Sequence, residues 1–136
     1  AVPFTLGLGR VIDRCLGLTA LQREYEALPP GDFVTASLAR LGVEVTVEQL
    51  ERVPERGAAI VIANHPTGAL DGLVVLHALR QRRADVRVLG NQWLTRIPEL
   101  RERTIPLDVF TALPSQHLAA LRQARRWLND GGVVVV

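Results

Sequence analysis

A histidine and a carboxylate lie close together in one short segment of the chain, Asn64-His65-Pro66-Thr67-Gly68-Ala69-Leu70-Asp71-Gly72. In a continuous helix the two side chains would point about 120° apart at about 100° per residue, so they would not share a face. Pro66 and Gly68 favour a loop instead. A turn that places Asp71 in the first turn of a following helix would bring its carboxylate back to the imidazole Nδ1 of His65.

Such a pair is suited to general-base catalysis. A neutral His65 would take a proton from a substrate hydroxyl at Nε2, and Asp71 would fix the tautomer and stabilise the imidazolium. The sequence contains no Gly-x-Ser-x-Gly elbow, and Cys15 lies on an apparent packing face, so the nucleophile is expected to come from the substrate. A purely structural role of Asp71, as an acid favoured by the helix dipole, stays open.

Three neighbours complete the predicted site. Asn64 is expected to shape the turn, and Thr67 and Gly68 to set the loop geometry, with Gly68 leaving room for the substrate. We group the three as predicted substrate-binding residues. His77 follows Asp71 by six residues, whereas helical metal ligands are usually three or four residues apart, so no metal site is predicted.

The segments around the motif predict a strand–helix–strand unit. Residues 58–63 are apolar without alternation, which is typical of a central strand that is covered on both faces. A helix is expected over residues 70–82 and a short strand over residues 86–89. The motif would then lie at the carboxyl end of a buried strand, where open α/β sheets usually bind ligands.

The remaining segments extend the same alternation of helices and strands. Two helices are expected within residues 8–28 and a third from Asp32 to Gly42. The strict alternation of residues 43–48 predicts a strand near a sheet edge. Further expected elements are a helix over 93–103 bent at Pro98, a strand over 104–110, a helix capped by Ser115 and closed by Gly131-Gly132, and a buried strand from residue 133.

The expected fold class is therefore α/β, with a mixed sheet flanked by helices. We expect a single domain made of a helical N-terminal section, residues 1–42, and an α/β core, residues 43–136. Both ends look cut, because the chain starts at Ala1 and stops inside a run of valines. Further site residues are therefore expected beyond Val136.

Composition excludes several classes of protein. The 136 residues are 48% hydrophobic, enough for one sizeable core, and the net charge of +2 is far below that of a typical nucleic-acid-binding domain. A single cysteine excludes an internal disulfide. The longest apolar stretch, residues 57–79, is interrupted by polar residues, so membrane attachment is expected to be peripheral. Residues 1–18 are the expected contact, and packing of their apolar residues on the domain itself stays open as the alternative.

Asn64-His65 followed by Asp71 resembles the first motif of the PlsC-type phospholipid and glycerol acyltransferases. The whole segment is similar to their lysophospholipid acyltransferase-like, or haemolysin, branch, and the flanks from Tyr25 to Asp108 fit that branch. Two features depart from the wider family. Five residues separate His65 from Asp71 instead of four, and Val109 stands where the second motif usually has an arginine that helps to hold an acceptor phosphate.

The resemblance implies transfer of a fatty acyl group from an acyl-CoA or acyl carrier protein thioester to a lysolipid hydroxyl. The chemistry requires no metal or redox cofactor, because the thioester is already activated. Because of Val109, the acceptor is expected to be a lyso-aminolipid or another lysolipid. The expected location is the cytoplasmic face of the bacterial inner membrane, or the cytoplasm. A lipid or thioester hydrolase and a non-catalytic membrane-surface module stay open as alternatives.

Overall fold

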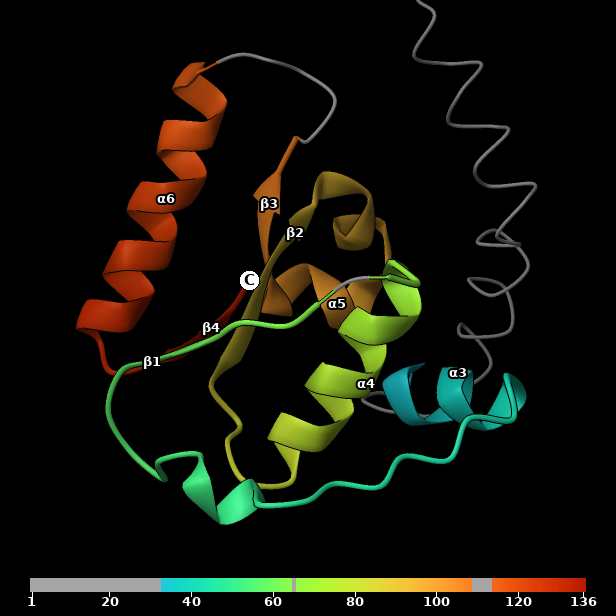
Figure 1. The fold of residues 1–136 in the computed structure, drawn as a ribbon. Coiled ribbons are helices and arrows are strands. Elements are labelled where there is room, and N and C mark those ends of the chain that lie inside the picture. Colours follow the sequence, from blue (N-terminus) through green and yellow to red (C-terminus); the bar gives the residue numbers. More distant parts are fainter. Residues whose placement is uncertain (1–32, 65, 109–113) are drawn as a thin grey trace, which may run out of the picture. The chain divides into compact units, whose positions relative to one another are not determined.

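The computed structural model describes residues 33–64, 66–108 and 114–136 (Figure 1). The chain divides into two compact units, Ala1–Phe33 and Val34–Val136, and every described strand belongs to the second. The helices expected within residues 8–28, the Asp32 cap and the expected membrane contact of residues 1–18 lie outside the described residues. The single-domain organisation stays a prediction.

Four short strands form one sheet in the order β1-β4-β2-β3. Their bounds are Ala59–Val61 for β1, Val86–Asn91 for β2, Thr104–Leu107 for β3 and Val133–Val135 for β4. Every described pairing is parallel, which fits the helix-containing connections between strands. The α/β class is confirmed, and the described part of the expected mixed sheet is parallel.

The centre of the sheet differs from the expected one. β4 lies between β1 and β2, and its three valines, Val133, Val134 and Val135, are 0–2% exposed. Burial of one such side chain contributes about 1.5–3 kcal/mol as an upper estimate. The run expected to be central instead contains β1, the edge strand of the sheet that the described residues form; Ile60 in β1 is 59% exposed and Ile62, just after it, is 82% exposed. β4 takes the more central position because it pairs with β1 on one side and with β2 on the other.

Helices flank the sheet on both faces. Helix α6 (Pro114–Asn129) packs on β3 and β4, and its Ala120 and Ala124 form a core cluster with Ile105 and Val134. Helices α4 (Ala69–Arg80) and α5 (Pro98–Arg103) pack against β2 on the opposite face (Figure 1). The predicted helix after the motif is thus confirmed.

Glycine ends α6 and lets the chain enter β4, as predicted. Gly131 has a φ of +86°, the N–H of Gly131 donates to the carbonyl of Leu128, and the N–H of Gly132 donates to that of Trp127. This is the Schellman pattern of a helix end. A side chain at Gly132 would overlap the indole of Trp127, so this position requires glycine for space. Helix α3 (Phe33–Arg40) ends in the same way at Gly42, whose φ is +65°.

Three local predictions were wrong in detail. Residues 43–48 form no strand in the structure, although valines and polar residues alternate in exposure, because a strand also requires a partner. Pro98 begins α5 at its first turn instead of bending one long helix, and a separate 3-10 helix, η2 (Gln92–Arg96), precedes it. Ser115 lies inside α6, which begins at Pro114. A shorter 3-10 helix, η1, spans Leu50–Arg52.

One buried arginine ties together the loops at the amino ends of the strands. The side chain of Arg83 is 3% exposed. Its guanidinium donates to both carboxylate oxygens of Asp85 at 2.7 Å and to the carbonyls of Pro54, Gly57 and Gly131 at 2.8–3.0 Å. The hydrogen bond from Arg83 lowers the pKa of Asp85, against the opposing effect of burial. These loops lead directly into β1, β2 and β4.

Candidate active site

The motif lies at the carboxyl edge of the sheet, between β1 and α4. β1 ends at Val61, Asn64 follows in an exposed position, and α4 begins at Ala69. Because the described strands are parallel, the carboxyl end of β2 lies at the same edge. His65 itself lies outside the described residues, so its role as the base stays a prediction.

Gly68 turns the chain from this loop into α4. Its φ of +71° and ψ of −112° form a backbone conformation that residues with a Cβ rarely adopt. No atom lies within 4 Å of the position that a Cβ would take, so the requirement for glycine is conformational and not steric. The turn places Asp71 in the first turn of α4, half-buried, as the loop interpretation of Pro66 and Gly68 predicts.

Thr67 holds both oxygens of the Asp71 carboxylate. Its backbone N–H donates to Oδ2 at 2.8 Å, and its Oγ1 hydroxyl donates to Oδ1 at 2.6 Å. An acid in the first turn that bonds back to a preceding N–H is a variant of the capping box. Since the hydroxyl proton of Thr67 is directed to Asp71, this oxygen would meet a substrate as an acceptor. The predicted substrate-binding roles of Asn64, Thr67 and Gly68 stay predictions.

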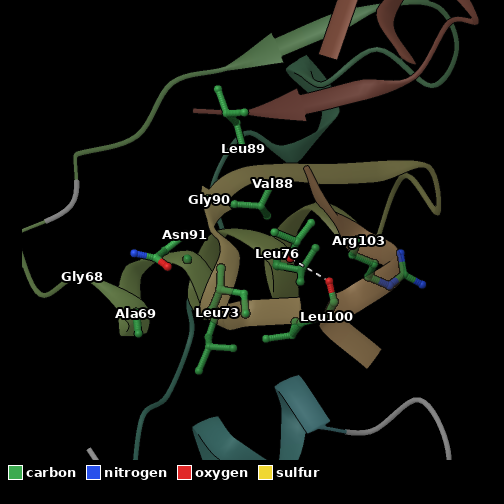
Figure 2. Close-up of a pocket in the computed structure, with 13 residues that line it drawn as sticks. Gly68, Ala69, Leu73, Leu76, Val88, Leu89, Gly90, Asn91, Leu100 and Arg103 are labelled. Atoms are coloured by element: carbon green, nitrogen blue, oxygen red, sulfur yellow. Dashed lines mark hydrogen bonds between the residues drawn. The ribbon is translucent and has the colours of Figure 1, made fainter. Parts of the chain in front are cut away.

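A pocket of about 480 Å³ lies between α4, β2 and α5, beside this motif (Figure 2). This size is within the roughly 300–1,000 Å³ that small-molecule sites occupy. Most of its lining is apolar. The lining residues are Gly68, Ala69, Gly72, Leu73, Leu76, Val88, Leu89, Gly90, Asn91, Leu94, Leu100, Arg103 and Thr104.

Two glycines keep space in the pocket wall. A Cβ at Gly72 would have no atom within 4 Å, so this helical position leaves room on the pocket side of α4. At Gly90 a Cβ would lie 2.9 Å from the end of the Leu94 side chain. We did not predict this pocket from the sequence, because leucines at helical spacing look the same whether they line a cavity or fill a core.

Asn91 is the polar residue at the pocket end of β2. Its Oδ1 accepts a hydrogen bond from the N–H of Trp93 at 3.0 Å and so caps η2. The amide Nδ2, a donor, takes no part in this cap, and Asn91 is one of the residues that line the pocket. Sequence reasoning missed Asn91 as a site residue, although a polar residue directly after a strand at this edge was the available signal.

The Arg96 guanidinium lies over the Trp93 ring, 4.3 Å from its centroid.

Other aromatic and histidine side chains have structural surroundings. Trp127 packs beside the core cluster, and its Nε1 donates to the carbonyl of Asp85 at 3.1 Å. His117 is half-buried, and its Nε2 lies 3.1 Å from the carbonyl oxygen of Asp108. His77 lies in the last turn of α4. Val109 lies outside the described residues.

The described residues, which leave out His65, contain no group of three or more histidine, cysteine, aspartate or glutamate residues arranged to hold a metal ion. No helix in residues 33–64, 66–108 and 114–136 is long and apolar enough to cross a membrane.

Comparisons with known proteins agree with the resemblance of the motif. A family model described as Acyltransferase matches residues 6–130. Lyso-glycine lipid O-acyltransferases from Phocaeicola vulgatus and Bacteroides thetaiotaomicron are 32% and 30% identical over 78 residues. The matched stretch is 57% of this chain but only 28% and 29% of these proteins, so the chain spans less than a third of the curated relatives that it matches. No solved structure matches.

Proposed function

The chain belongs to the acyltransferase family, and on this premise we propose that the whole protein transfers a fatty acyl group from a thioester to a hydroxyl of a lysolipid. The observation that carries the proposal is the apolar pocket directly beside the loop that presents Asp71. The names of the two relatives, both lyso-glycine lipid O-acyltransferases, support a lysolipid as the acceptor.

In the proposed reaction His65 is the base that first takes up a proton and later returns it. His65 Nε2 takes the proton of the acceptor hydroxyl while the hydroxyl oxygen bonds to the thioester carbonyl carbon. The tetrahedral intermediate then collapses, the carbon–sulfur bond breaks, and the imidazolium returns the proton to the leaving sulfur. The products are an ester and a free thiol. The carboxylate of Asp71 orients the ring and stabilises the imidazolium between the two proton transfers.

The fatty chain of the donor would lie in the pocket. Leu73, Leu76 and Leu100 provide an apolar surface there, as Figure 2 shows. With the chain in this position, the thioester would lie at the end of the pocket formed by Gly68 and Asn91. The Nδ2 group of Asn91 would then donate to the carbonyl oxygen as negative charge develops on it.

The proposal also includes the acyl donor, the acceptor and the location of the protein. The donor is acyl-CoA or an acyl carrier protein thioester, and no metal is required because the thioester is activated. The acceptor is a lyso-aminolipid, which fits both Val109 in place of the family's phosphate-binding arginine and the names of the relatives. A membrane-embedded acceptor requires the site to reach the lipid surface, so we place the protein peripherally at the cytoplasmic face of the inner membrane.

The test is acyl transfer by the purified full-length protein, with acyl-CoA and acyl carrier protein donors and a panel of lysolipids. We expect ester formation that depends on the lysolipid and that falls about 100- to 10,000-fold in His65→Ala, the range for loss of a general base. Wild-type turnover by His65→Ala would exclude this base. Equal thioester consumption with and without lysolipid would indicate a hydrolase, and vesicle binding without any transfer would indicate a non-catalytic module.

A further inference from the structure

We propose that Thr67 is a positioning residue, which fixes the plane of the Asp71 carboxylate through its side-chain hydroxyl and thereby orients His65. The inference rests on the proposed function, in which Asp71 is the partner of the base. It goes beyond the predicted His–Asp pair by adding a residue that acts through Asp71 and has no chemical step of its own.

Thr67 fixes the Asp71 carboxylate at two points. One residue donates to both oxygens of one carboxylate, with the N–H bonded to Oδ2 at 2.8 Å and the hydroxyl bonded to Oδ1 at 2.6 Å. Rotation of the carboxylate about the Cβ–Cγ bond of Asp71 breaks at least one of these bonds. An ionised carboxylate has about four acceptor positions, so the two bonds from Thr67 do not by themselves saturate it.

The hydroxyl of Thr67 has a role distinct from helix capping. A cap satisfies backbone N–H groups that have no partner within the helix, and the N–H of Thr67 obtains its partner whatever the side chain is. The hydroxyl bond satisfies no backbone donor. Its effect is on the orientation of the carboxylate, so the side chain of Thr67 does something that the cap does not require.

The spacing of the motif also gives Thr67 a part in placing Asp71. Five residues separate His65 from Asp71, and Gly68, with its φ of +71°, turns the chain between them. The two bonds bring the Asp71 carboxylate back across this turn to the level of Thr67, two positions from His65. Thr67 and Gly68 thus compensate together for the longer connection, one by a bond and the other by its backbone conformation.

The test compares Thr67→Val with Thr67→Ser in the full-length protein. Valine keeps the shape, the β-branching and the backbone N–H of threonine but lacks the hydroxyl, whereas serine keeps the hydroxyl. We expect Thr67→Val to lower kcat about 3- to 30-fold, the effect of one exposed hydrogen bond to a charged group, with less than about twofold change in KM for the lysolipid. Thr67→Ser should stay within about threefold of wild type.

A double-mutant cycle shows whether Thr67 acts through Asp71. In an Asp71→Ala background the valine substitution should have no further effect on kcat, because no carboxylate is left to position. If the double variant lost kcat by the product of the two single losses, the proposal would be overturned. Wild-type kcat in Thr67→Val, with Asp71→Ala impaired, would overturn it while leaving the proposed function intact. A raised KM for the lysolipid with unchanged kcat would show instead that Thr67 contacts the acceptor.

A readout without turnover distinguishes failure of this inference from failure of the proposed function. Nitrogen-15 NMR of the neutral His65 ring should show mainly the Nδ1–H tautomer in wild type and Thr67→Ser, and a larger Nε2–H share in Thr67→Val and Asp71→Ala. This pattern would support positioning even in a protein that transfers no acyl group. Identical tautomer populations in all four proteins would overturn the inference.

Discussion

The amino and carboxyl edges of the sheet are organised by different kinds of contact. At the amino edge, the buried Arg83 donates to carbonyls of residues 26, 29 and 48 positions away. At the carboxyl edge, Thr67 bonds to Asp71 four positions away, in an exposed setting. Long-range bonds between loops hold the fold together, whereas local bonds shape one loop on a scaffold that is already formed. Stability and chemistry should therefore be separable between the two edges.

The separation of stability from chemistry is tested most strongly by altering one residue at each edge. Asp71→Asn removes the charge that supports the imidazolium, so kcat should fall about 10- to 10,000-fold. Arg83→Met should lower the free energy of unfolding by about 3 kcal/mol or more, because it leaves several buried acceptors without a donor. The measurements are steady-state turnover of the full-length protein and urea denaturation of each variant.

The comparison also predicts what each change should leave unaltered. Asp71→Asn should change the free energy of unfolding by about 1 kcal/mol or less, the scale of one charge at a helix start. The folded fraction of Arg83→Met should keep its kcat. Arg82→Met is the matched control, because Arg82 is 25% exposed and donates to a single carbonyl, that of Val53. A kcat loss in Arg83→Met as large as that in Asp71→Asn would contradict the separation.

A smaller effect is expected at Gly68, where the turn into α4 requires a positive φ. Gly68→Ala forces an alanine into a φ of +71°, which should cost about 1–3 kcal/mol and also lower kcat, because the turn positions Asp71. Gly72→Ala serves as the control, since a helical glycine with open space should gain about 0.5–1 kcal/mol on replacement by alanine. Equal thermal stability of the two variants would show that the turn at Gly68 relaxes without cost.

The smallest expected effect is on the preference for donors of different chain length. Gly72→Leu adds a side chain at a residue that lines the pocket, at a position where a Cβ has no atom within 4 Å. For long-chain donors, kcat/KM should fall about tenfold relative to short-chain donors, since a mismatch of one or a few methylenes costs about 1–3 kcal/mol. Competition between thioesters of different chain length measures this ratio directly. An unchanged ratio would mean that the fatty chain binds elsewhere.

The sequence predicted local elements better than their order in space. Residues 133–136 were predicted to begin a buried strand, and β4 is buried. Residues 58–63 have the same apolar pattern, yet β1 lies at the edge. The pattern of a segment indicates that it can be buried, but its position depends on which other strand pairs with it. For β1 that partner is β4, which is distant in sequence.

The candidate site shows the same limit. Pro66 and Gly68 predicted a loop, and this was enough to place Asp71 in the first turn of α4. The bonds from Thr67 were not predicted, because they depend on the φ and ψ values that Gly68 adopts. The pocket was not predicted either, since it forms where α4, β2 and α5 meet and no single segment contains it.

The position of β4 also has a consequence for the order of folding during synthesis. β1 and β2 do not pair with each other, and each pairs with β4, which is the last of the described strands to be made. While the ribosome is still adding α6, the β2–β3 pair can form, but β1 has no neighbour in this sheet. The strand that leads into the motif therefore gains its partner in this sheet only after β4 has been made, whereas α4, which carries Asp71, packs on the earlier strand β2.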